Sequence, residues 1–339
     1  MLKTININGF KSFLDNNLTF GHLTLLTGLN SSGKSSIIQS ILIFERAFKN
    51  NRDILLESHG SLKEIKNIYQ KGNIKLELFD DLENNSILEL IDEEESKGRY
   101  NFESKITSFP EIIYISANRY GPRNIVPIYN NSSLINKIGI NGENLFQFIR
   151  SYESEILDKS LIHPKSEGNT VEFNIRGWLS VITPNVKFSY KIDEKSDTSY
   201  SLFNEHRSTN VGYGLSYSLS VIASLLISTL IPNCLVIIEN PEAHLHPKGQ
   251  TEIAKLISLC ANFGTQIIVE THSDHIFDSV RVNCKELSGF SEKVHLHWFE
   301  LNEYNNSIIK TPVIDNKGKL NEWPEGLFDQ FEINASKLI

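Results

Sequence analysis

Hydrophobic and polar positions alternate or cluster along the chain in patterns that predict strands and helices in turn. Residues 2–8 and 18–27 are rich in β-forming side chains and predict two strands, the second of which ends at the start of a Gly-rich loop. In residues 35–49 the apolar side chains fall at helical spacing. The pattern therefore predicts a strand, a Gly-rich loop and a helix in that order.

The middle of the chain is less regular. Residues 51–109 mix short strand-like runs, such as 74–79 and 87–91, with charged turns, and predict an antiparallel lobe. The acidic run 92–95 predicts a solvated turn. Residues 130–206 are polar, of mixed pattern and without sustained heptads, which predicts an inserted subdomain rather than a coiled coil.

The last third carries the most apolar segments. Residues 235–238 and 266–269 are wholly or nearly apolar, as expected for central parallel strands covered on both faces, and a helical pattern at 249–262 lies between them. Residues 111–116 are a further strand candidate. The apolar stretch 215–231 is interrupted by serines and a threonine, so we expect a buried helix and no membrane span.

The bulk composition is that of a soluble globular protein, with 40% hydrophobic and 22% charged residues. Acidic residues exceed basic ones by 41 to 33, which argues against nucleic-acid binding through phosphate charge alone, although a local basic patch is compatible with it. We expect Arg119 and Arg123 to lie in a solvated loop; contact with nucleotide, partner or DNA is the alternative. The three widely spaced cysteines and the absence of a signal-like start predict a cytoplasmic protein.

The Gly-rich loop, residues 28–35, matches the P-loop pattern that holds the phosphates of ATP with a magnesium ion. Successive backbone N–H groups of such a loop point inward, and the following helix presents its positive end. Lys34 would pair with the β and γ phosphates, and the Ser35 hydroxyl would ligate magnesium. We therefore expect ATP and Mg²⁺ as ligands. The predicted nucleotide-binding residues of this loop are Gly28, Asn30, Ser31, Ser32, Gly33, Lys34, Ser35 and Ser36.

A second motif, residues 235–242, is an apolar strand that ends in acid, the Walker B pattern. Glu239 is expected to join Ser35 in the magnesium shell. The next position usually carries the glutamate that activates water, but here it is Asn240. Loss of a general base commonly costs about 100-fold to 10,000-fold in rate, or about 3 to 5.5 kcal/mol. Hydrolysis is therefore expected to be slow, or Glu242 acts as the base instead.

A third motif, residues 267–275, is another strand that ends in a polar turn. His272 at this edge could donate a hydrogen bond to the γ-phosphate and sense its loss. The ten histidines also suggest zinc, but they lie in separate strand-end and loop settings without an H-E-x-x-H or CxxC companion. His295 and His297 alternate along a strand-like run, which predicts that they share one exposed face.

Several segments resemble members of one family. Gly-Phe-Lys-Ser-Phe at residues 9–13 is similar to the opening of structural maintenance of chromosomes (SMC) proteins. Residues 25–27 leading into the P-loop, together with 239–247 and 271–275, resemble overcoming-lysogenisation-defect (OLD) proteins. Trp-Pro-Glu-Gly-Leu-Phe-Asp at 323–329 resembles the tail of a poorly characterised prokaryotic subgroup. The chain thus looks like a compact ABC-type ATPase of the branch that includes SMC, RecF and OLD proteins.

This resemblance implies an α/β fold, the P-loop NTPase head of ABC-type ATPases, with a mixed sheet, helices and an antiparallel β lobe. Residues 1–125 would form the N-terminal half of the head with Walker A. Residues 207–339 would form the C-terminal half, with the signature motif, Walker B and the His switch. Residues 126–206 would be a small inserted subdomain.

The resemblance also places a degenerate signature motif at residues 210–216, shortly before the Walker B strand. In ABC-type ATPases this motif caps the γ-phosphate bound by the opposite subunit. Ser216 would be the matching serine, and Gly212 and Gly214 would allow close backbone approach. A head-to-tail homodimer around ATP is implied, with residues 243–246 in its contact loop.

Two functions from different classes follow. The first is an ATPase that dimerises around ATP and controls a separate effector protein, a nuclease or toxin, in anti-phage defence or DNA repair. The second is a hydrolysis-poor, ATP-bound clamp or sensor that acts as a binding scaffold, which Asn240 favours. OLD-like nucleases carry a Toprim domain after the ATPase, but the residues after His275 show no carboxylate cluster suited to two metals, so no intrinsic nuclease is expected. DNA binding, the partner and the activating signal stay open.

Overall fold

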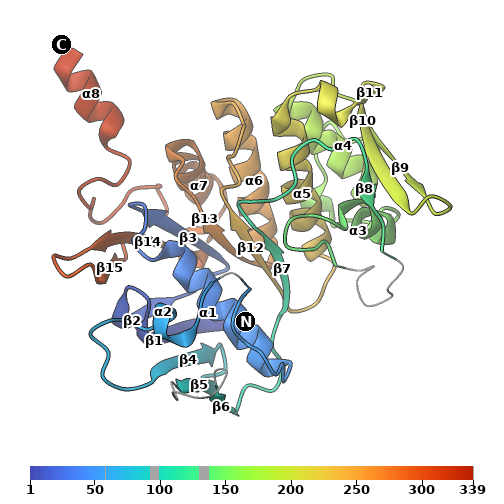
Figure 1. The fold of residues 1–339 in the computed structure, drawn as a ribbon. Helices are drawn as coiled ribbons and strands as arrows, with labels where there is room; N and C mark the ends of the chain where they lie inside the picture. Colours follow the sequence, from blue (N-terminus) through green and yellow to red (C-terminus); the bar gives the residue numbers. More distant parts are fainter. Residues whose placement is uncertain (58, 92–98, 130–136, 339) are drawn as a thin grey trace. The chain divides into compact units, whose positions relative to one another are not determined.

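The computed structural model describes residues 1–57, 59–91, 99–129 and 137–338, so the predicted acidic turn at 92–95 lies outside the described residues. The chain forms two compact units, each with its own strands and helices (Figure 1). Unit 1 comprises Met1–Pro110, His295–Val313 and Leu320–Ile339, and unit 2 comprises Glu111–Val294 and Ile314–Lys319.

A five-stranded antiparallel sheet forms a large part of unit 1, in the order β2-β1-β4-β5-β6. Buried and more exposed positions alternate along β5, because successive side chains point to opposite faces of a strand. The antiparallel lobe predicted within residues 51–109 is therefore confirmed. The strands are β1 (Leu2–Phe10), β2 (Phe13–Thr19), β4 (Ile74–Asp80), β5 (Asn85–Ile91) and β6 (Arg99–Ser104).

The strand, loop and helix that carry the P-loop also lie in unit 1. Strand β3 (Leu23–Gly28) is buried at all six positions, and helix α1 (Lys34–Phe48) follows the loop. Phe44 and Phe48 of α1 pack edge-on against the ring of Phe102 in β6. Strands run in the order β15-β14-β3, with β14 antiparallel to β15. The remaining elements of this unit are α2 (Leu62–Ile65), β14 (Val294–Leu301), β15 (Ser307–Lys310) and α8 (Gln330–Leu338).

One predicted strand is wrong: residues 18–27 do not form a single strand. The chain turns after β2, where the N–H of Gly21 donates to Thr24 Oγ1 at 3.1 Å, and β3 begins as a new strand. The polar side chains of Asp15 and Asn17 point outward from β2 and concealed it as a strand. Its buried positions are Phe13 and Leu18, five residues apart, so no alternation of apolar and polar residues marked the strand in the sequence.

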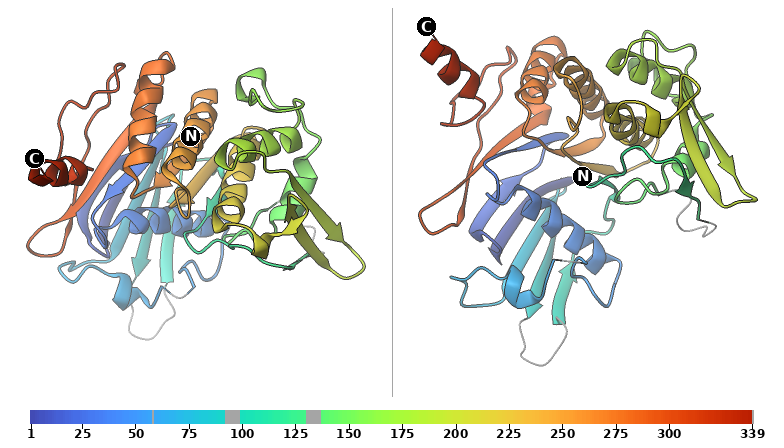
Figure 2. Two further views of the ribbon diagram at one scale, coloured as in Figure 1. Left: turned by 90° about the horizontal axis from the view of Figure 1, so that it is seen from above. Right: turned by 45° about the horizontal axis from the view of Figure 1, so that its top comes forward.

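Unit 2 is built on parallel strands in the order β13-β12-β7. Helices α5, α6 and α7 lie side by side in Figures 1 and 2, and α4 packs against α5 and α6. Strand β12 is buried along its apolar run, as expected for a central strand. The main strands are β7 (Glu111–Ile115), β12 (Cys234–Glu239) and β13 (Gln266–Glu270). The helices are α3 (Leu145–Tyr152), α4 (Val171–Ile182), α5 (Tyr213–Ser228), α6 (Pro247–Phe263) and α7 (Asp274–Glu286).

The segment predicted as an insert contributes to the same compact unit. Strands β9 and β10 form an antiparallel hairpin, and β10 also pairs with β8 and β11. Because α4 packs on α5 and α6, most of residues 126–206 cluster with unit 2. Within the described residues, no helix is both long and apolar enough to cross a membrane. These smaller strands are β8 (Val126–Pro127), β9 (Phe188–Asp193), β10 (Thr198–Phe203) and β11 (His206–Arg207), and the short 3-10 helices are Lys159–Leu161, Ser208–Asn210 and Ser291–Lys293.

Candidate nucleotide-binding site

The two glycines of the P-loop allow it to pack closely against β14 and β15 within unit 1. Gly28 has a φ of 140°, and a Cβ there would lie 2.2 Å from the backbone oxygen of Phe299 in β14. Gly33, directly before α1, has a φ of 110°, and a Cβ would lie 2.6 Å from Ser307 Oγ in β15. Both positions therefore exclude larger residues, for reasons of backbone conformation and of space.

The P-loop lysine is folded back over the loop itself. Lys34 Nζ donates to the carbonyl oxygens of Gly28 at 3.1 Å and Leu29 at 2.6 Å, and the residue is only 3% exposed. The hydroxyl of Ser32 also donates to the oxygen of Leu29, at 2.6 Å. The ammonium group of Lys34 is thus held by carbonyl oxygens of the same loop whose N–H groups would face phosphate oxygens. Of the other predicted loop residues, Asn30, Ser31 and Ser35 are exposed and Ser36 is buried.

The turn between β1 and β2 lies beside the P-loop. Ser12 Oγ is 2.7 Å from the hydroxyl of Ser307, which also contacts the loop. Lys11 has a positive φ of 51°, and its Nζ donates to the Gln39 side chain of α1. Burial lowers the pKa of Lys11. Ser12 therefore lies beside the P-loop, and Lys11 lies beside the helix that follows it.

The predicted metal-binding carboxylate lies at the end of β12 in unit 2. Glu239 Oε1 accepts a hydrogen bond from the hydroxyl of Tyr114 at 2.9 Å, and Oε2 accepts one from the backbone N–H of Ala117 at 2.9 Å. Burial, and then the charge of Glu239, raise the pKa of Tyr114 above its usual value, so the phenol remains a donor. Each carboxylate oxygen keeps a further lone pair, so Glu239 is oriented and still able to ligate a hard cation. Tyr114 was missed by the sequence analysis, because its contact depends on β7 pairing beside β12.

Arg119 supports the same strand end from inside unit 2, and the expected solvated loop is wrong for this residue. It is 1% exposed, and its guanidinium donates to the backbone oxygens of Glu239 at 2.8 Å and Asn240 at 2.7 Å. A third bond goes to the oxygen of Tyr217 in α5, at 3.2 Å. Burial lowers the pKa of Arg119 to about 10, so the group stays charged at neutral pH. Arg123, in contrast, is exposed as expected.

The two residues after Glu239 differ in their surroundings. Asn240 has a φ of 46°, a left-handed conformation that asparagine tolerates better than most residues, and its N–H donates to the oxygen of Glu270 at 2.8 Å. Glu242 Oε1 accepts a bond from the backbone N–H of His272 at 2.8 Å, whereas its Oε2 is buried without a hydrogen-bond partner among the described residues. Burial raises the pKa of Glu242. The predicted base and the predicted γ-phosphate sensor are therefore brought together.

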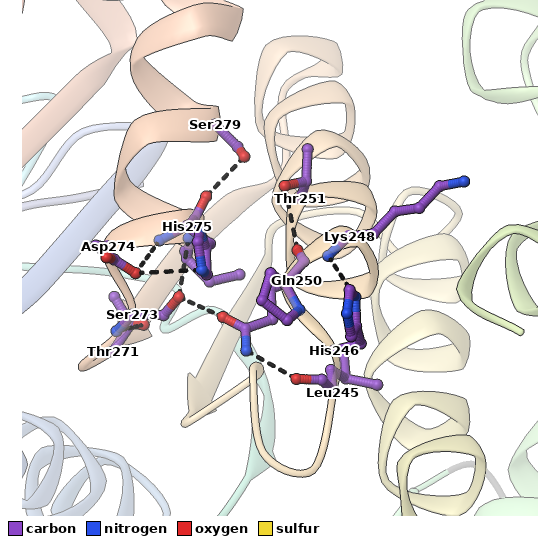
Figure 3. A network of polar contacts seen from close by, with 12 residues as sticks. Leu245, His246, Lys248, Gln250, Thr251, Thr271, Ser273, Asp274, His275 and Ser279 are labelled. Carbon is purple, nitrogen blue, oxygen red and sulfur yellow. Dashed lines mark hydrogen bonds and ion pairs between the residues drawn. The ribbon is translucent and has the colours of Figure 1, made fainter.

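Gln250 of α6 joins the loops that follow β12 and β13 (Figure 3). Its Nε2 donates to the backbone oxygen of Leu245 at 2.8 Å, and its Oε1 accepts from Ser273 Oγ at 2.5 Å. Ser273 is also the N-cap of α7, where its hydroxyl accepts from Ile276 N at 3.1 Å. A movement of the loop that carries His272 would thus be transmitted to the loop after Walker B through the side chain of Gln250.

The predicted signature residues lie at the start of α5. A Cβ on Gly214 would lie 2.7 Å from the backbone oxygen of His244, which shows the close approach expected of the glycine. Gly212 is the N-cap residue and is exposed. The hydroxyl of Ser216, one turn further on, is buried and lines a cavity of unit 2, without a hydrogen-bond partner among the described residues. Its action across a dimer stays a prediction, and would require the side chain to rotate.

The expectation of one exposed face for His295 and His297 is wrong. His297 is 1% exposed, and its ring nitrogens contact Thr311 Oγ1 at 3.0 Å and the oxygen of Thr19 at 2.8 Å. Burial lowers the pKa of His297 to about 4. In the described part of the chain, no group of three or more His, Cys, Asp or Glu side chains is placed to hold a metal ion.

Comparisons with known proteins agree with this architecture. Residues 141–277 match the AAA ATPase domain family, and residues 291–338 match a family described as Protein of unknown function (DUF3696). A search of curated proteins gives no match.

Several solved structures are similar, among them heads of SMC proteins. An SMC head bound to the C-winged helix domain of ScpA aligns at 14% identity over 92% of this chain and 98% of that chain, with a TM-score of 0.57. The Smc head domain with an extended coiled coil, bound to the C-terminal domain of ScpA derived from Pyrococcus furiosus, aligns at 11% identity over 100% and 99%, with a TM-score of 0.54. The recombination mediator protein RecF gives 12% identity over 92% and 98%, with a TM-score of 0.47.

These similarities show the fold: the chain has the α/β fold of SMC heads, as the resemblance implied. The family match to residues 141–277 is to an ATPase domain. The narrower resemblance of residues 323–329 to one prokaryotic subgroup stays a prediction.

Proposed function

We propose that this protein binds and hydrolyses ATP with Mg²⁺, dimerises around the nucleotide and controls a separate effector. The observation that carries the proposal is the P-loop, where Gly28 and Gly33 adopt the left-handed backbone of a phosphate-binding turn and Lys34 is held within it. Such a turn at the start of a helix is suited to bind phosphate, because free N–H groups and the helix dipole favour negative charge.

The proposed roles in nucleotide and magnesium binding fall on this loop and on the carboxylate that ends β12. Lys34 would pair with the β and γ phosphates, and the Ser35 hydroxyl and the Glu239 carboxylate would hold the magnesium ion. The exposed position of Ser35 and the oriented carboxylate of Glu239 support these roles. A bound magnesium ion would neutralise charge on the phosphate oxygens.

Glu242 is the proposed general base. Its Oε2 lies buried without a partner among the described residues, and burial raises its pKa toward the range in which a carboxylate accepts a proton readily. The bond from the N–H of His272 holds Oε1, so Oε2 is the oxygen that we propose to accept the proton of the attacking water. His272, whose side chain is exposed, is the proposed γ-phosphate sensor.

A second candidate is the hydrolysis-poor clamp or sensor, which one observation favours. The position that usually carries the catalytic glutamate is Asn240, whose side-chain oxygen is buried without a hydrogen-bond partner among the described residues. A protein of this kind would bind ATP and change its contacts with a partner without turning the nucleotide over.

Steady-state ATPase assays separate the two candidates. Wild type is compared with Lys34→Ala and Glu242→Gln, and with Lys63→Ala and Glu205→Gln as controls at exposed residues of the same types. The enzyme requires that both site variants lose activity, Glu242→Gln by about 100-fold to 10,000-fold, while the controls retain it. A wild-type rate no higher than that of Lys34→Ala supports the clamp. If calorimetry also detects no uptake of Mg-ATP by wild type, both candidates fail.

The dimer is proposed as head-to-tail, with Gly212, Gly214 and Ser216 of one copy near the nucleotide of the other. Light scattering on Glu242→Gln with Mg-ATP should give twice the 38.6 kDa chain mass, and Lys34→Ala should stay at the mass of one chain. A single-chain mass for both proteins, at a nucleotide concentration that saturates binding, would refute the ATP-dependent dimer.

The effector is proposed as a separate nuclease or toxin in the cytoplasm, serving anti-phage defence or DNA repair. Support comes from the fold, because the two SMC heads compared above were solved with domains of another protein, ScpA, bound to them. DNA is tested by adding duplex DNA to the ATPase assay. A rate that rises only with DNA would support repair or defence roles that read DNA directly, and an unchanged rate would argue for activation by a protein.

A further inference from the structure

The C-terminal segment of unknown function supplies part of the wall of the P-loop. Residues 291–338 match a family without an assigned function, and this segment includes β14 and β15. From β14, the oxygen of Phe299 accepts the backbone N–H of Leu29 at 3.1 Å. From β15, the hydroxyl of Ser307 lies 2.7 Å from the backbone oxygen of Ser32. Both contacts are made to the loop itself and lie within unit 1.

Ser307 also joins the loop to the turn between β1 and β2. Its Oγ lies 2.7 Å from Ser12 Oγ as well as 2.7 Å from Ser32 O. A hydroxyl carries one hydrogen, and a carbonyl oxygen only accepts. Ser307 Oγ is the donor toward both Ser12 Oγ and Ser32 O, so these two acceptors share its one hydrogen, and Ser307 is the hydroxyl of this pair that donates to the loop.

The position of Ser307 is fixed independently of its hydroxyl. Its backbone N–H donates to the oxygen of Ser12 at 2.8 Å, and its backbone oxygen accepts from Asn16 Nδ2 at 3.1 Å. The residue is 5% exposed, and its Oγ is the atom that a Cβ on Gly33 would meet first. Removal of the hydroxyl would thus leave β15 attached while releasing the loop.

We propose that Ser307 is a positioning residue for nucleotide binding, and that the C-terminal segment serves to hold the P-loop in its phosphate-binding shape through the hydrogen bond from Ser307 Oγ to the backbone oxygen of Ser32. This rests on the proposed ATP binding. A loop held in its bound shape loses less conformational freedom when the nucleotide arrives, so affinity depends on the bond.

The test measures ATP and ADP dissociation constants by calorimetry, and the melting temperature without nucleotide. Ser307→Ala should weaken binding about fivefold, the change expected when about 1 kcal/mol of hydrogen bonding is lost, with a melting temperature close to that of wild type. Ser12→Ala should have a smaller effect, because Ser307 keeps its own hydrogen for Ser32.

The matched control is Ser86→Ala. Ser86 is a fully buried serine of unit 1 whose hydroxyl lies 2.7 Å from that of Ser104, away from the P-loop. This variant should leave both dissociation constants unchanged. Equal affinities for Ser307→Ala and wild type would overturn the proposal while ATP binding itself stands; absence of binding by wild type would instead refute the proposed function.

A pair of variants of equal shape covers the case in which Ser307→Ala does not fold. Ser307→Thr keeps the hydroxyl and Ser307→Val lacks it, and both residues suit a strand. Tighter nucleotide binding by the threonine variant, by about fivefold, supports the proposal. Equal affinities for the two variants would overturn it, because shape alone would then account for the effect.

Discussion

Replacement of Arg119 should separate the stability of unit 2 from the chemistry at its strand end. The guanidinium donates to four backbone oxygens, those of Ser116, Tyr217, Glu239 and Asn240, at 3.3, 3.2, 2.8 and 2.7 Å. Arg119→Lys keeps the charge but not the planar fork, so one ammonium group cannot reach all four oxygens. Arg119→Met removes both charge and donors while keeping much of the volume.

The magnitude follows from the two shortest bonds. A hydrogen bond from a charged donor contributes about 1.5 to 3 kcal/mol, and a buried carbonyl left without a partner costs a similar amount. Loss of the bonds to Glu239 and Asn240 should therefore lower the free energy of unfolding by about 3 to 6 kcal/mol in Arg119→Met. Arg119→Lys should lie between this variant and wild type, because an ammonium can still satisfy one or two oxygens.

Urea denaturation measures the stability, and the Mg²⁺ dependence of the ATPase rate measures the effect on the site. If Arg119 positions the end of β12, Arg119→Lys should need more magnesium for half-maximal rate than wild type, since the backbone that carries the Glu239 side chain would be held by fewer hydrogen bonds. Arg123→Lys, at an exposed arginine of the same loop, is the control and should change neither quantity. A loss of less than 1 kcal/mol in Arg119→Met would refute the reasoning.

Three further predictions concern single side chains. His297 should make the protein less stable in acid, because its pKa is about 4 in the folded state and 6.5 in the unfolded state. Between these two pH values the unfolded state binds the proton and the folded state does not. The free energy of unfolding should therefore fall by up to about 3 kcal/mol as the pH falls from 6.5 to about 4. His297→Gln should flatten that part of the stability curve in denaturation at several pH values; an unchanged slope would contradict the assignment. Asn240→Ala should cost about 1 kcal/mol in thermal unfolding because of the left-handed φ of 46°, and Asn240→Gly should not, so equal melting temperatures would contradict the strain. Gln250→Leu should lower the ATPase rate more than Gln250→Glu, which keeps the acceptor for Ser273; the reverse order would show that this bond does not matter.

The elements that carry the P-loop and Walker B motifs were predictable because their signals are local. Helical spacing after Gly33 and the wholly apolar run before Glu239 each determine an element within a few residues. The contacts of Tyr114 and Arg119 were not predictable, since they depend on the pairing of β7 with β12 and on the packing of α5. A charged residue in a polar loop is normally solvated, and only the fold shows that backbone oxygens replace water around Arg119.

For His295 and His297 the strand was predictable from the sequence, but the burial of its face was not. Alternation along residues 294–301 suggested a strand with one solvated face, and the strand itself is confirmed as β14. The burial of His297 depends on Thr19, which is distant in the sequence, and on Thr311, which lies in a neighbouring segment. These two residues provide the hydrogen-bond partners of both ring nitrogens. Periodicity gives the direction of a side chain, but whether that face is covered depends on the rest of the fold.

The choice between the enzyme and the clamp depends on the geometry of the residues after Glu239. The left-handed backbone at Asn240 disfavours a glutamate there, because Cβ strains this conformation in most residues, whereas the short polar side chain of asparagine tolerates it. An acid at this position would therefore be costly, and Asn240→Glu should not by itself raise the hydrolysis rate. Glu242 has the free oxygen and the raised pKa that a base requires, and its other oxygen is held by the N–H of His272. If hydrolysis occurs, we therefore expect it to depend on the glutamate whose position the sensor loop fixes.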